Sequence, residues 1–414
     1  MAKKYNCTKN GIQYFRKTKV VGHKPNGKPI VKEFYGDGEK DADRQIEEYM
    51  NNKNNGLNVD TQNLTIEEAM HQWLFDTLLL SKNKKSASFE KHECNYRNYI
   101  KDRKIGCIKV FNAVSRPFQL YYNDLYKNGL NYLDVRSNKI KHIDVTSNKI
   151  FDLNKTLRAF FNYCIKQKYT LDNPCLLGNI EIPGNADGDE DESDELEEEI
   201  LAFSDNEISI LTSNLKYVPE KDNTFKIMIY FGLITGLRQG ELLGLKKKFL
   251  EKYIVKVRNT LKRLKVFDAN GEWHYELKLI KPKSKTSIRN VNFPVAFWDT
   301  LELYLKEQEI KWGKNGLKFN DDSLLFTTNS CKPINSTNFT RAWRRFLKRI
   351  NIEYKKPHSL RDTYATTLVR KGASILDVKS LLGHSSIKIT EKYYLFVFPE
   401  DKSTTANLLN DLII

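Results

Sequence analysis

An acidic run between Asp187 and Glu199 divides this chain into two parts that must each build a core of their own. The run holds ten carboxylates and no Lys or Arg, and the turn-forming pair Pro183-Gly184 precedes it. A segment so charged and so poor in apolar residues cannot bury enough surface to fold, and it is typical of a solvated linker. We therefore predict a linker over residues 177–202 with folded parts before and after it.

Within the part before the linker, residues 1–57 are predicted to form a small β-rich module. Two strands, 11–21 and 29–35, flank the turn signal Pro25-Asn-Gly-Lys28, and a helix is expected over 40–52. The hairpin is unusually basic. Its candidate DNA contacts are Arg16, Lys17, Lys19 and Lys28. A solvated basic edge that deters strand pairing is the alternative interpretation of these charges.

Residues 62–176 have helical periodicity throughout. Thr65 and Glu68 have the spacing of a capping box, and further helices are expected over 88–100, 116–126 and 147–168. Arg97, on the helix expected over 88–100, is a further candidate DNA contact.

Residues 203–414 combine many helical patterns with three short β patterns, at 253–261, 266–280 and 288–293, which we expect to pair in one small antiparallel sheet. The predicted fold class is multidomain α+β. It comprises a small β-rich N-terminal domain, a helical domain, and a mixed, mainly α C-terminal domain with a small antiparallel sheet.

The charge balance indicates a polyanionic partner. The chain of 414 residues has a net charge of +16 and a pI near 9.3, despite the acidic run. Nucleic acid is the commonest partner of so basic a chain. Besides the interpretation as a linker, a weaker one is that the acidic run competes with DNA for a basic groove. We see no signal peptide and no apolar run near the ~20 residues that a membrane helix needs, so we expect a cytoplasmic protein without a membrane partner. The six cysteines are scattered, which argues against a disulfide framework or a zinc site.

Five positions in the C-terminal part form an ordered set that suits phosphodiester chemistry. They are Arg238, His358, Arg361, His384 and one of the adjacent pair Tyr393 and Tyr394. Arginines can bind the nonbridging oxygens of a phosphate in bidentate fashion, and a tyrosine hydroxyl can attack the phosphorus. A covalent phosphotyrosine conserves the bond energy, so strands could be rejoined without ATP, and no metal or other cofactor is expected.

Each member of the set alone has a common structural explanation. An arginine such as Arg238 often pairs with a glutamate three residues on, here Glu241, and His358 and Arg361 would simply share one helix face. His384 could end a helix, and the two tyrosines could be core aromatics. The order of the whole set argues for a function.

In these motifs the chain resembles the tyrosine recombinase (phage integrase) family. The similar segments are Thr-Gly-Leu-Arg238-Gln-Gly-Glu-Leu-Leu, Pro-Lys283-Ser-Lys-Thr-Ser-Ile-Arg, His358-Ser-Leu-Arg361-Asp-Thr-Tyr-Ala-Thr, Leu-Leu-Gly-His384-Ser-Ser and the Tyr393-Tyr394 pair. The helical part resembles the family's core-binding domain, and the N-terminal hairpin resembles its arm-binding domain.

The resemblance implies a role for each matching residue. Arg238 and Arg361 would clamp the scissile phosphate, and His358 and His384 would hydrogen-bond it. Lys283 would protonate the leaving 5′ oxygen, with Lys285 as the alternative, and Glu241 would orient its neighbours.

The nucleophile is open between two adjacent tyrosines. Tyr393 lies nine residues after His384 and Tyr394 lies ten after it, and the resemblance allows either spacing. The continuation Leu-Phe-Val-Phe-Pro-Glu aligns better with Tyr394, which is the expected nucleophile, with Tyr393 as the alternative.

The function implied is that of a site-specific DNA recombinase that integrates and excises a mobile element through a covalent 3′-phosphotyrosine. Its expected partners are double-stranded DNA with core and arm attachment sites, three further copies in a homotetramer, and host or element-encoded DNA-bending and directionality factors. The alternatives are a noncatalytic DNA-binding regulator and a type IB topoisomerase-like enzyme. A metal-dependent nuclease is disfavoured because no carboxylate cluster stands near the histidines.

Overall fold

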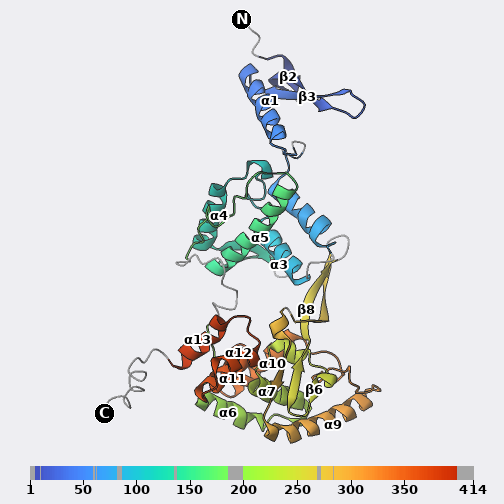
Figure 1. Cartoon of the computed structure of the whole chain (residues 1–414), viewed down its shortest axis with the longest axis vertical. Helices are drawn as coiled ribbons and strands as arrows, with labels where there is room; N and C mark the ends of the chain where they lie inside the picture. The colour runs from blue at the N-terminus through green and yellow to red at the C-terminus, as the bar shows by residue number, and fades with distance from the viewer. Residues whose placement is uncertain are drawn as a thin grey trace, which may run out of the picture. The chain divides into compact units, whose positions relative to one another are not determined.

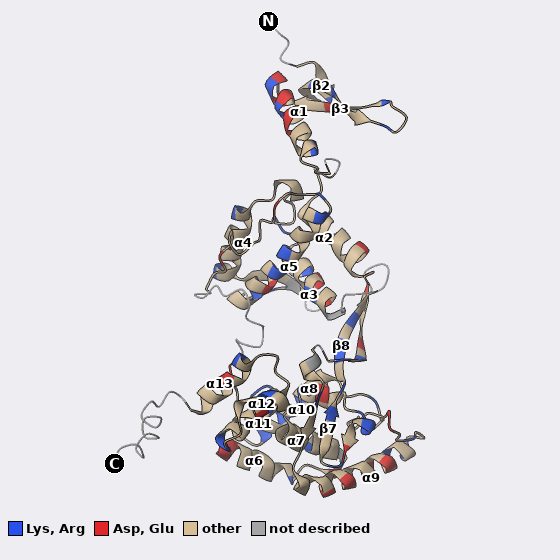
Figure 2. Ribbon diagram, viewed as in Figure 1, with Lys and Arg blue, Asp and Glu red and all other residues tan. Residues whose placement is uncertain are grey.

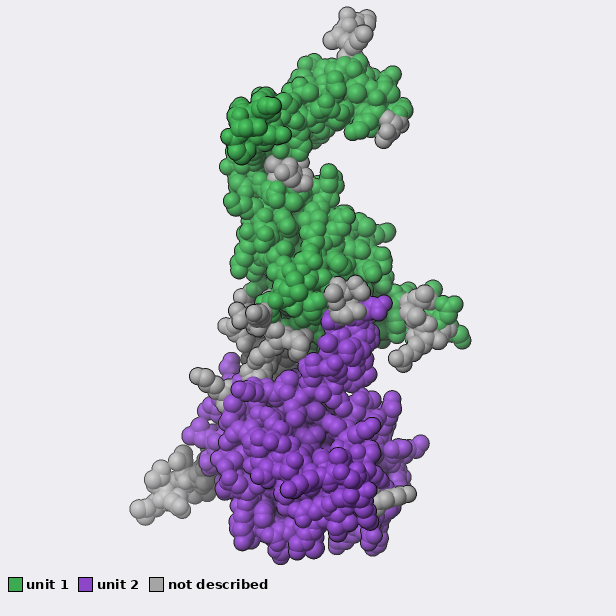
Figure 3. Space-filling view, turned by 90° about the vertical axis from the view of Figure 1, so that its right-hand side faces the viewer, with its two compact units in different colours: residues 1–190 green, residues 191–414 purple. Residues whose placement is uncertain are grey.

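The computed structural model divides the chain into two compact units, residues 1–190 and 191–414 (Figure 3). It describes residues 5–9, 11–58, 61, 63–81, 86–134, 138–184, 199–267, 272–282 and 284–398. The division falls inside the segment predicted to be a linker, although most of the acidic run lies outside the described residues. The exact domain boundaries remain a prediction.

The N-terminal module is a three-stranded antiparallel sheet covered by one helix (Figure 1). Its elements are β1 (Cys7–Lys9), β2 (Ile12–His23), β3 (Pro29–Gly36) and α1 (Glu39–Asn54). Gly27, at a φ of +78°, takes the left-handed conformation that the Asn-Gly turn signal predicted. A small core of Val21, Phe34 and Tyr49 joins the sheet to the helix. The predicted hairpin and helix are present, and β1 adds a strand that the periodicity did not indicate.

The helical part of the first unit begins with the predicted capping box, in which the Thr65 hydroxyl accepts from the backbone N–H of Glu68. Its helices are α2 (Ile66–Gln72), the π-helical continuation η2 (Trp73–Leu78), α3 (Ser86–Tyr99), the 3₁₀ turn η3 (Val110–Asn112), α4 (Ser115–Asn128) and α5 (Ser147–Lys166). Phe160 and Phe161 of α5 are fully buried, and with Leu157 and Cys164 they form an apolar stripe along this helix.

One hairpin in this part was not predicted. Strands β4 (Leu130–Asp134) and β5 (Lys139–Ile143) pair antiparallel between α4 and α5. All five residues of β5 are exposed, including Ile140 and Ile143, so the hairpin buries little. The two isoleucines are three residues apart and do not alternate with polar residues, which leaves a weak strand pattern.

The second unit is mainly helical. Its helices are α6 (Asp205–Leu215), η4 (Glu220–Asp222), α7 (Asn223–Thr235), α8 (Gln239–Leu243), η5 (Lys247–Phe249), η6 (Lys285–Ser287), η7 (Val295–Phe297), α9 (Trp298–Lys314), α10 (Ser336–Arg349), α11 (Ser359–Arg370), α12 (Ile375–Leu382) and α13 (Ile387–Val397). Helix α11 packs against α7, α12 and α13, and it therefore stands at the centre of the unit. Helix α13 was not predicted from the periodicity.

The expected single sheet of this unit is wrong. Strands β6 (Leu250–Glu251), β7 (Ile254–Val257) and β10 (Arg289–Asn292) form one antiparallel sheet in the order β10-β7-β6. A separate hairpin pairs β8 (Thr260–Phe267) with β9 (Trp273–Ile280). The predicted strand 266–280 therefore spans two strands, because the alternation of apolar residues resumes after the turn signal Asn270-Gly271, which lies outside the described residues.

The combination of helices with small antiparallel sheets confirms the α+β prediction. Figure 2 shows basic residues along the β8–β9 hairpin and acidic residues along α9. Over the described part of the chain, no helix combines the length and the apolar character that a membrane span requires.

Candidate active site

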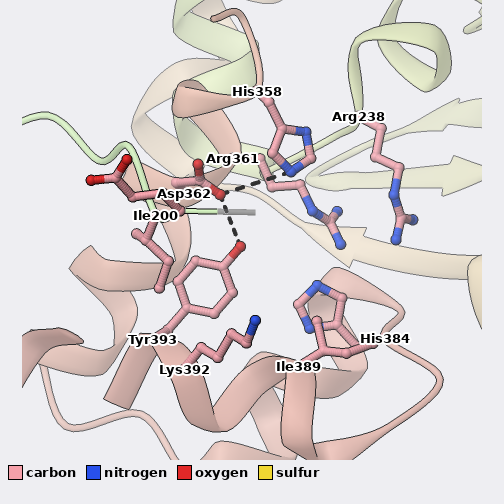
Figure 4. Close-up of a pocket in the computed structure, with 10 residues that line it drawn as sticks. Ile200, Arg238, His358, Arg361, Asp362, His384, Ile389, Lys392 and Tyr393 are labelled. Carbon is pink, nitrogen blue, oxygen red and sulfur yellow. Dashed lines mark hydrogen bonds and ion pairs between the residues drawn. The ribbon is translucent and has the colours of Figure 1, made fainter. Parts of the chain in front are cut away.

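A pocket of about 350 Å³ in the second unit gathers most of the predicted site residues (Figure 4). Its lining comes from α8, α11, α12–α13 and the chain just before α6. The lining residues are Glu199, Ile200, Arg238, His358, Arg361, Asp362, His384, Ile389, Lys392 and Tyr393.

Arg361 on α11 is buried, and its direction is fixed by two backbone carbonyls. Its Nη1 donates to the Gly236 carbonyl at 2.9 Å, and its Nη2 donates to the Leu382 carbonyl at 2.7 Å. Burial, then the charges of Arg238 and Arg289, lower the pKa of Arg361 to about 9, so it stays cationic at neutral pH. A cation held in this way has little freedom to reorganise when an anion arrives.

Gly236 places its carbonyl against Arg361 because it ends α7 in the left-handed conformation, with a φ of +60°. A Cβ at this position would lie 2.3 Å from the Tyr364 ring, so only glycine fits.

Arg238 and Arg289 both contact the buried carboxylate of Glu241. Arg238 Nη1 lies 3.3 Å from Glu241 Oε1, and Arg289 Nη2 lies 2.9 Å from Glu241 Oε2. Burial alone would raise the pKa of Glu241, but Arg289 and the other two arginines lower it. The structural pair anticipated between Arg238 and Glu241 therefore exists, and Arg238 lines the pocket as well.

Arg289 is a residue whose role the sequence analysis missed. It belongs to a quoted motif, and the alternation of β10, with Arg289 and Val291 buried and Asn290 and Asn292 exposed, could have indicated that it points inward. Its Nε also donates to the Leu381 carbonyl at 2.6 Å, which ties β10 to α12.

Both predicted histidines lie in the pocket and are neutral at physiological pH. Burial, followed by the charges of Arg361 and Arg238, lowers the pKa of His358 to about 4 and that of His384 to about 2. His384 is buried, and its Nδ1 lies 2.9 Å from the hydroxyl of Thr390. His358 Nε2 lies 3.8 Å from Asp362 Oδ1.

The two tyrosines of the adjacent pair project in different directions from α13. Tyr393 lines the pocket, is buried, and donates its hydroxyl to Asp362 Oδ1 at 2.8 Å. Its ring is nearly parallel to that of His384, with the centroids 6.1 Å apart. Tyr394 donates its hydroxyl to the Ala373 carbonyl and does not line the pocket.

Tyr394, the expected nucleophile, is thus not among the residues that face the arginines. Successive residues of an α-helix point about 100° apart, so a shift of one residue moves the hydroxyl to another face of α13. The alternative, Tyr393, is the tyrosine that the structure brings together with Arg238, Arg361, His358 and His384.

The predicted general acid cannot be placed. Lys283 lies outside the described residues, and of Lys285 only the backbone is described, at the start of the 3₁₀ turn η6. Lys392 and Asp362, which the sequence analysis did not single out, line the pocket. Both are immediate sequence neighbours of predicted site residues, which is the one signal that could have drawn attention to them.

The predicted DNA contacts outside the pocket differ in their surroundings. Arg16 is paired with Glu33 at 3.3 Å, and Arg97 is paired with Glu93 at 2.7 Å. Lys17 contacts Asp43 at 2.7 Å and is held against α1. Lys19 and Lys28 are exposed on the N-terminal hairpin.

No group of three or more His, Cys, Asp and Glu side chains suited to a metal ion occurs among the described residues.

Comparisons with known proteins find relatives in sequence and in fold. Residues 202–398 match the phage integrase family. A tyrosine recombinase XerC-like protein of Caldanaerobacter subterraneus subsp. tengcongensis is 37% identical over the full length of both chains. The ICEBs1 integrase of Bacillus subtilis is 26% identical over 48% of this chain and 52% of its own. A solved structure of the Tn1549 transposon integrase in complex with a circular intermediate DNA is similar in fold, with a TM-score of 0.60 and 18% identity over 83% of this chain and 99% of that one.

Proposed function

The chain belongs to the phage integrase family of tyrosine recombinases, and from this premise we propose that Tyr393 is the residue that attacks DNA. The enzyme is a site-specific recombinase that breaks and rejoins DNA strands. Neither alternative function, a noncatalytic regulator or a type IB topoisomerase-like enzyme, has support among its relatives. The observation that carries the assignment is the presence of Tyr393 in one pocket with two arginines and two histidines.

The proposed mechanism starts with the phosphate. Arg361 and Arg238 bind its nonbridging oxygens and neutralise the charge that grows on the pentavalent phosphorus. His358 and His384, being neutral, contribute hydrogen bonds without adding charge. Arg289 and Glu241 do not contact the phosphate in this mechanism, but their buried ion pair keeps Arg238 in place.

Tyr393 then attacks in line with the leaving 5′ oxygen. The bond from its Oη to phosphorus forms as the bond from phosphorus to O5′ breaks, and Lys283 supplies the proton that O5′ needs. Attack by the released 5′ hydroxyl of another strand on the 3′-phosphotyrosine reverses the step and rejoins the DNA. This chemistry requires neither a metal ion nor ATP.

We also propose a wider reaction, by analogy with the relatives. The Tn1549 transposon integrase is known in complex with a circular intermediate DNA, and lambda integrase in complex with a core site. We therefore infer that this chain binds double-stranded core sites through its two units and arm sites through Arg16, Lys19 and Lys28 of the N-terminal module. Four copies would exchange strands in pairs, with DNA-bending and directionality factors choosing between integration and excision. We place the reaction in the cytoplasm of a bacterial host, on its DNA.

The test is covalent capture. Purified protein is incubated in EDTA with a nicked core-site duplex from its own element, whose cut releases a short fragment so that rejoining fails, and the products are run on a denaturing gel. We expect protein attached to the 3′ end of the cut strand. Cut DNA with free ends only, or binding without cutting, would contradict the proposal.

A further inference from the structure

Asp362 is a buried carboxylate in the pocket that no part of the mechanism above uses. It follows Arg361 on α11 and is only 5% exposed. Its Oδ1 accepts the hydroxyl of Tyr393 at 2.8 Å, and its Oδ2 accepts the backbone N–H of Leu201 at 3.4 Å. Figure 4 shows the hydroxyl of Tyr393 and the ring of His358 both directed toward this carboxylate.

When the Tyr393 hydroxyl attacks the phosphorus, it loses its proton, and another group must accept that proton. Burial, and then the nearby Asp362 carboxylate, raise the pKa of Tyr393 well above its ordinary value, so the free enzyme holds a protonated phenol. The positive charges of Arg361 and Arg238 act to lower this pKa. A phenol in this state becomes a useful nucleophile only if a base receives its proton during the attack.

The contacts distinguish the possible acceptors. Within the pocket the groups that can carry charge around Tyr393 are Glu199 before α6, Arg238 at α8, His358, Arg361 and Asp362 of α11, His384 after α12, and Lys392 beside it on α13. The two arginines and Lys392 have no free lone pair to offer, which leaves Glu199, Asp362 and the two neutral histidines as possible acceptors. Among the hydrogen bonds recorded for the described residues, the Tyr393 hydroxyl is donated to Asp362, while His358 is 3.8 Å from the same Asp362 oxygen.

We propose that Asp362 is a further catalytic residue, the general base that takes the proton of Tyr393 as its hydroxyl attacks the scissile phosphate. In the step, the O–H bond of Tyr393 breaks, its proton passes to Asp362 Oδ1, the Oη–phosphorus bond forms and the phosphorus–O5′ bond breaks. The proton needed by O5′ comes separately from the general acid, so the step is balanced. In the rejoining reaction Asp362 returns the proton to the departing Tyr393. This inference rests on the proposed role of Tyr393.

The geometry also explains why a carboxylate is tolerated so close to an incoming phosphate. The negative charge of Asp362 lies among Arg361, Arg238 and Lys392, and protonation during the attack removes that charge at the moment when the phosphorus becomes more negative. The second oxygen, fixed by Leu201, keeps the first one directed at Tyr393.

The experiment compares wild-type protein with Asp362→Asn and Asp362→Glu in single-turnover cleavage of the nicked duplex at several pH values. Asparagine keeps an oxygen for the Leu201 N–H and a polar partner for Tyr393, but it cannot take a proton. We expect Asp362→Asn to cleave at least about 100-fold more slowly than wild type at neutral pH, the size of a general-base contribution. Because only the phenolate of Tyr393 can react in this variant, its cleavage rate should rise about tenfold for each pH unit. The cleavage rate of wild type should depend less on pH.

Asp362→Glu restores a carboxylate and should recover part of the cleavage rate. Asp205→Asn is the matched control, because Asp205 is an exposed carboxylate that pairs with Arg370 away from the pocket, and its rate should equal that of wild type. Folding of each variant is checked by its affinity for the same duplex. If Asp362→Asn does not bind DNA, the pH profile of Asp362→Glu decides. A displaced carboxylate base should slow cleavage but keep a pH profile as flat as that of wild type. A rate that instead rises about tenfold for each pH unit would contradict the inference.

Two results would overturn the inference: an Asp362→Asn rate within about threefold of wild type, or a slow Asp362→Asn variant whose pH profile has the wild-type shape, which indicates a purely structural role. Both leave the wild-type covalent adduct in place. Failure of the proposed function would show itself differently, as absence of an adduct from the wild-type protein or as an adduct on a residue other than Tyr393.

Discussion

The guanidinium of Arg361 is hydrogen-bonded to the ends of α7 and α12. Its contribution to cleavage therefore depends on the planar shape of the group as much as on its charge. Lysine has a single point-like ammonium and cannot donate to both the Gly236 and Leu382 carbonyls while also binding a phosphate. We expect Arg361→Lys to lower the single-turnover cleavage rate by at least about 100-fold with little change in DNA affinity.

Arg370 on the same helix offers the matched control for that change. It pairs with exposed Asp205 outside the pocket, so Arg370→Lys should cleave at the wild-type rate. Equal rates for Arg361→Lys and wild type would show that the bidentate geometry is unimportant.

The buried histidines predict how stability depends on pH. His384 has a folded pKa of about 2, below its ordinary value of 6.5, so the unfolded chain binds a proton that the folded chain does not. The neutral His384 therefore costs the folded state no stability above about pH 6.5. As the pH drops from there toward the folded pKa, the unfolded chain gains the proton and the folded state becomes less stable. In urea unfolding, His384→Gln should make the loss of stability between about pH 7.5 and pH 5 smaller than in wild type.

His142→Gln is the comparison for that measurement, because His142 is exposed on β5. An unchanged pH slope in His384→Gln would contradict the assigned neutral state.

At the scale of elements, the left-handed end of α7 carries the contact between Gly236 and Arg361. Gly236→Ala would combine an unfavourable φ with a Cβ 2.3 Å from the Tyr364 ring. Gly316 after α9 has a similar φ of +69° but open space around it. We expect Gly316→Ala to cost about 1 kcal/mol of unfolding free energy, from the backbone conformation alone.

Gly236→Ala should cost more than Gly316→Ala and should slow cleavage as well, because α7 and α11 must separate to admit the methyl group. Thermal unfolding and single-turnover cleavage of both variants test this. Equal effects on stability, with unchanged cleavage in both, would show that the α7–α11 contact does not hold Arg361.

The helix patterns allowed His358 and Arg361 to be placed on one face of α11, since a three-residue spacing requires it. They did not distinguish Tyr393 from Tyr394, because α13 was not predicted and motif alignment cannot tell which face of a helix meets the arginines. The Arg289–Glu241 pair joins residues 48 positions apart on different elements, and only the fold brings them together. The β8–β9 hairpin was merged with its neighbours because the apolar alternation has the same period on both strands.

At the scale of the whole molecule, the net charge of +16 predicts how DNA binding responds to salt. Binding of a basic protein to duplex DNA releases counterions from the phosphates, so affinity for the core site should fall by at least about 10³-fold between about 50 mM and about 200 mM salt. Fluorescence anisotropy with a labelled duplex measures this, and a flat response would contradict a phosphate-based interface.

The acidic run offers a second test at this scale. As a solvated linker, Asp187–Glu199 should be removable without changing the affinity for nonspecific DNA, provided that a neutral Gly-Ser segment of equal length replaces it. Tighter binding after the replacement would instead show that the run competes with DNA for a basic surface.

The central claim is that Tyr393, and not its neighbour, becomes joined to DNA. The most direct measurement runs Tyr393→Phe and Tyr394→Phe beside wild type on the nicked duplex in EDTA, with DNA binding of each variant confirmed first. The structure predicts that the covalent adduct disappears only in Tyr393→Phe, because that hydroxyl alone of the two lies in the pocket with Arg238 and Arg361. An adduct that persists in Tyr393→Phe and disappears in Tyr394→Phe would contradict the account.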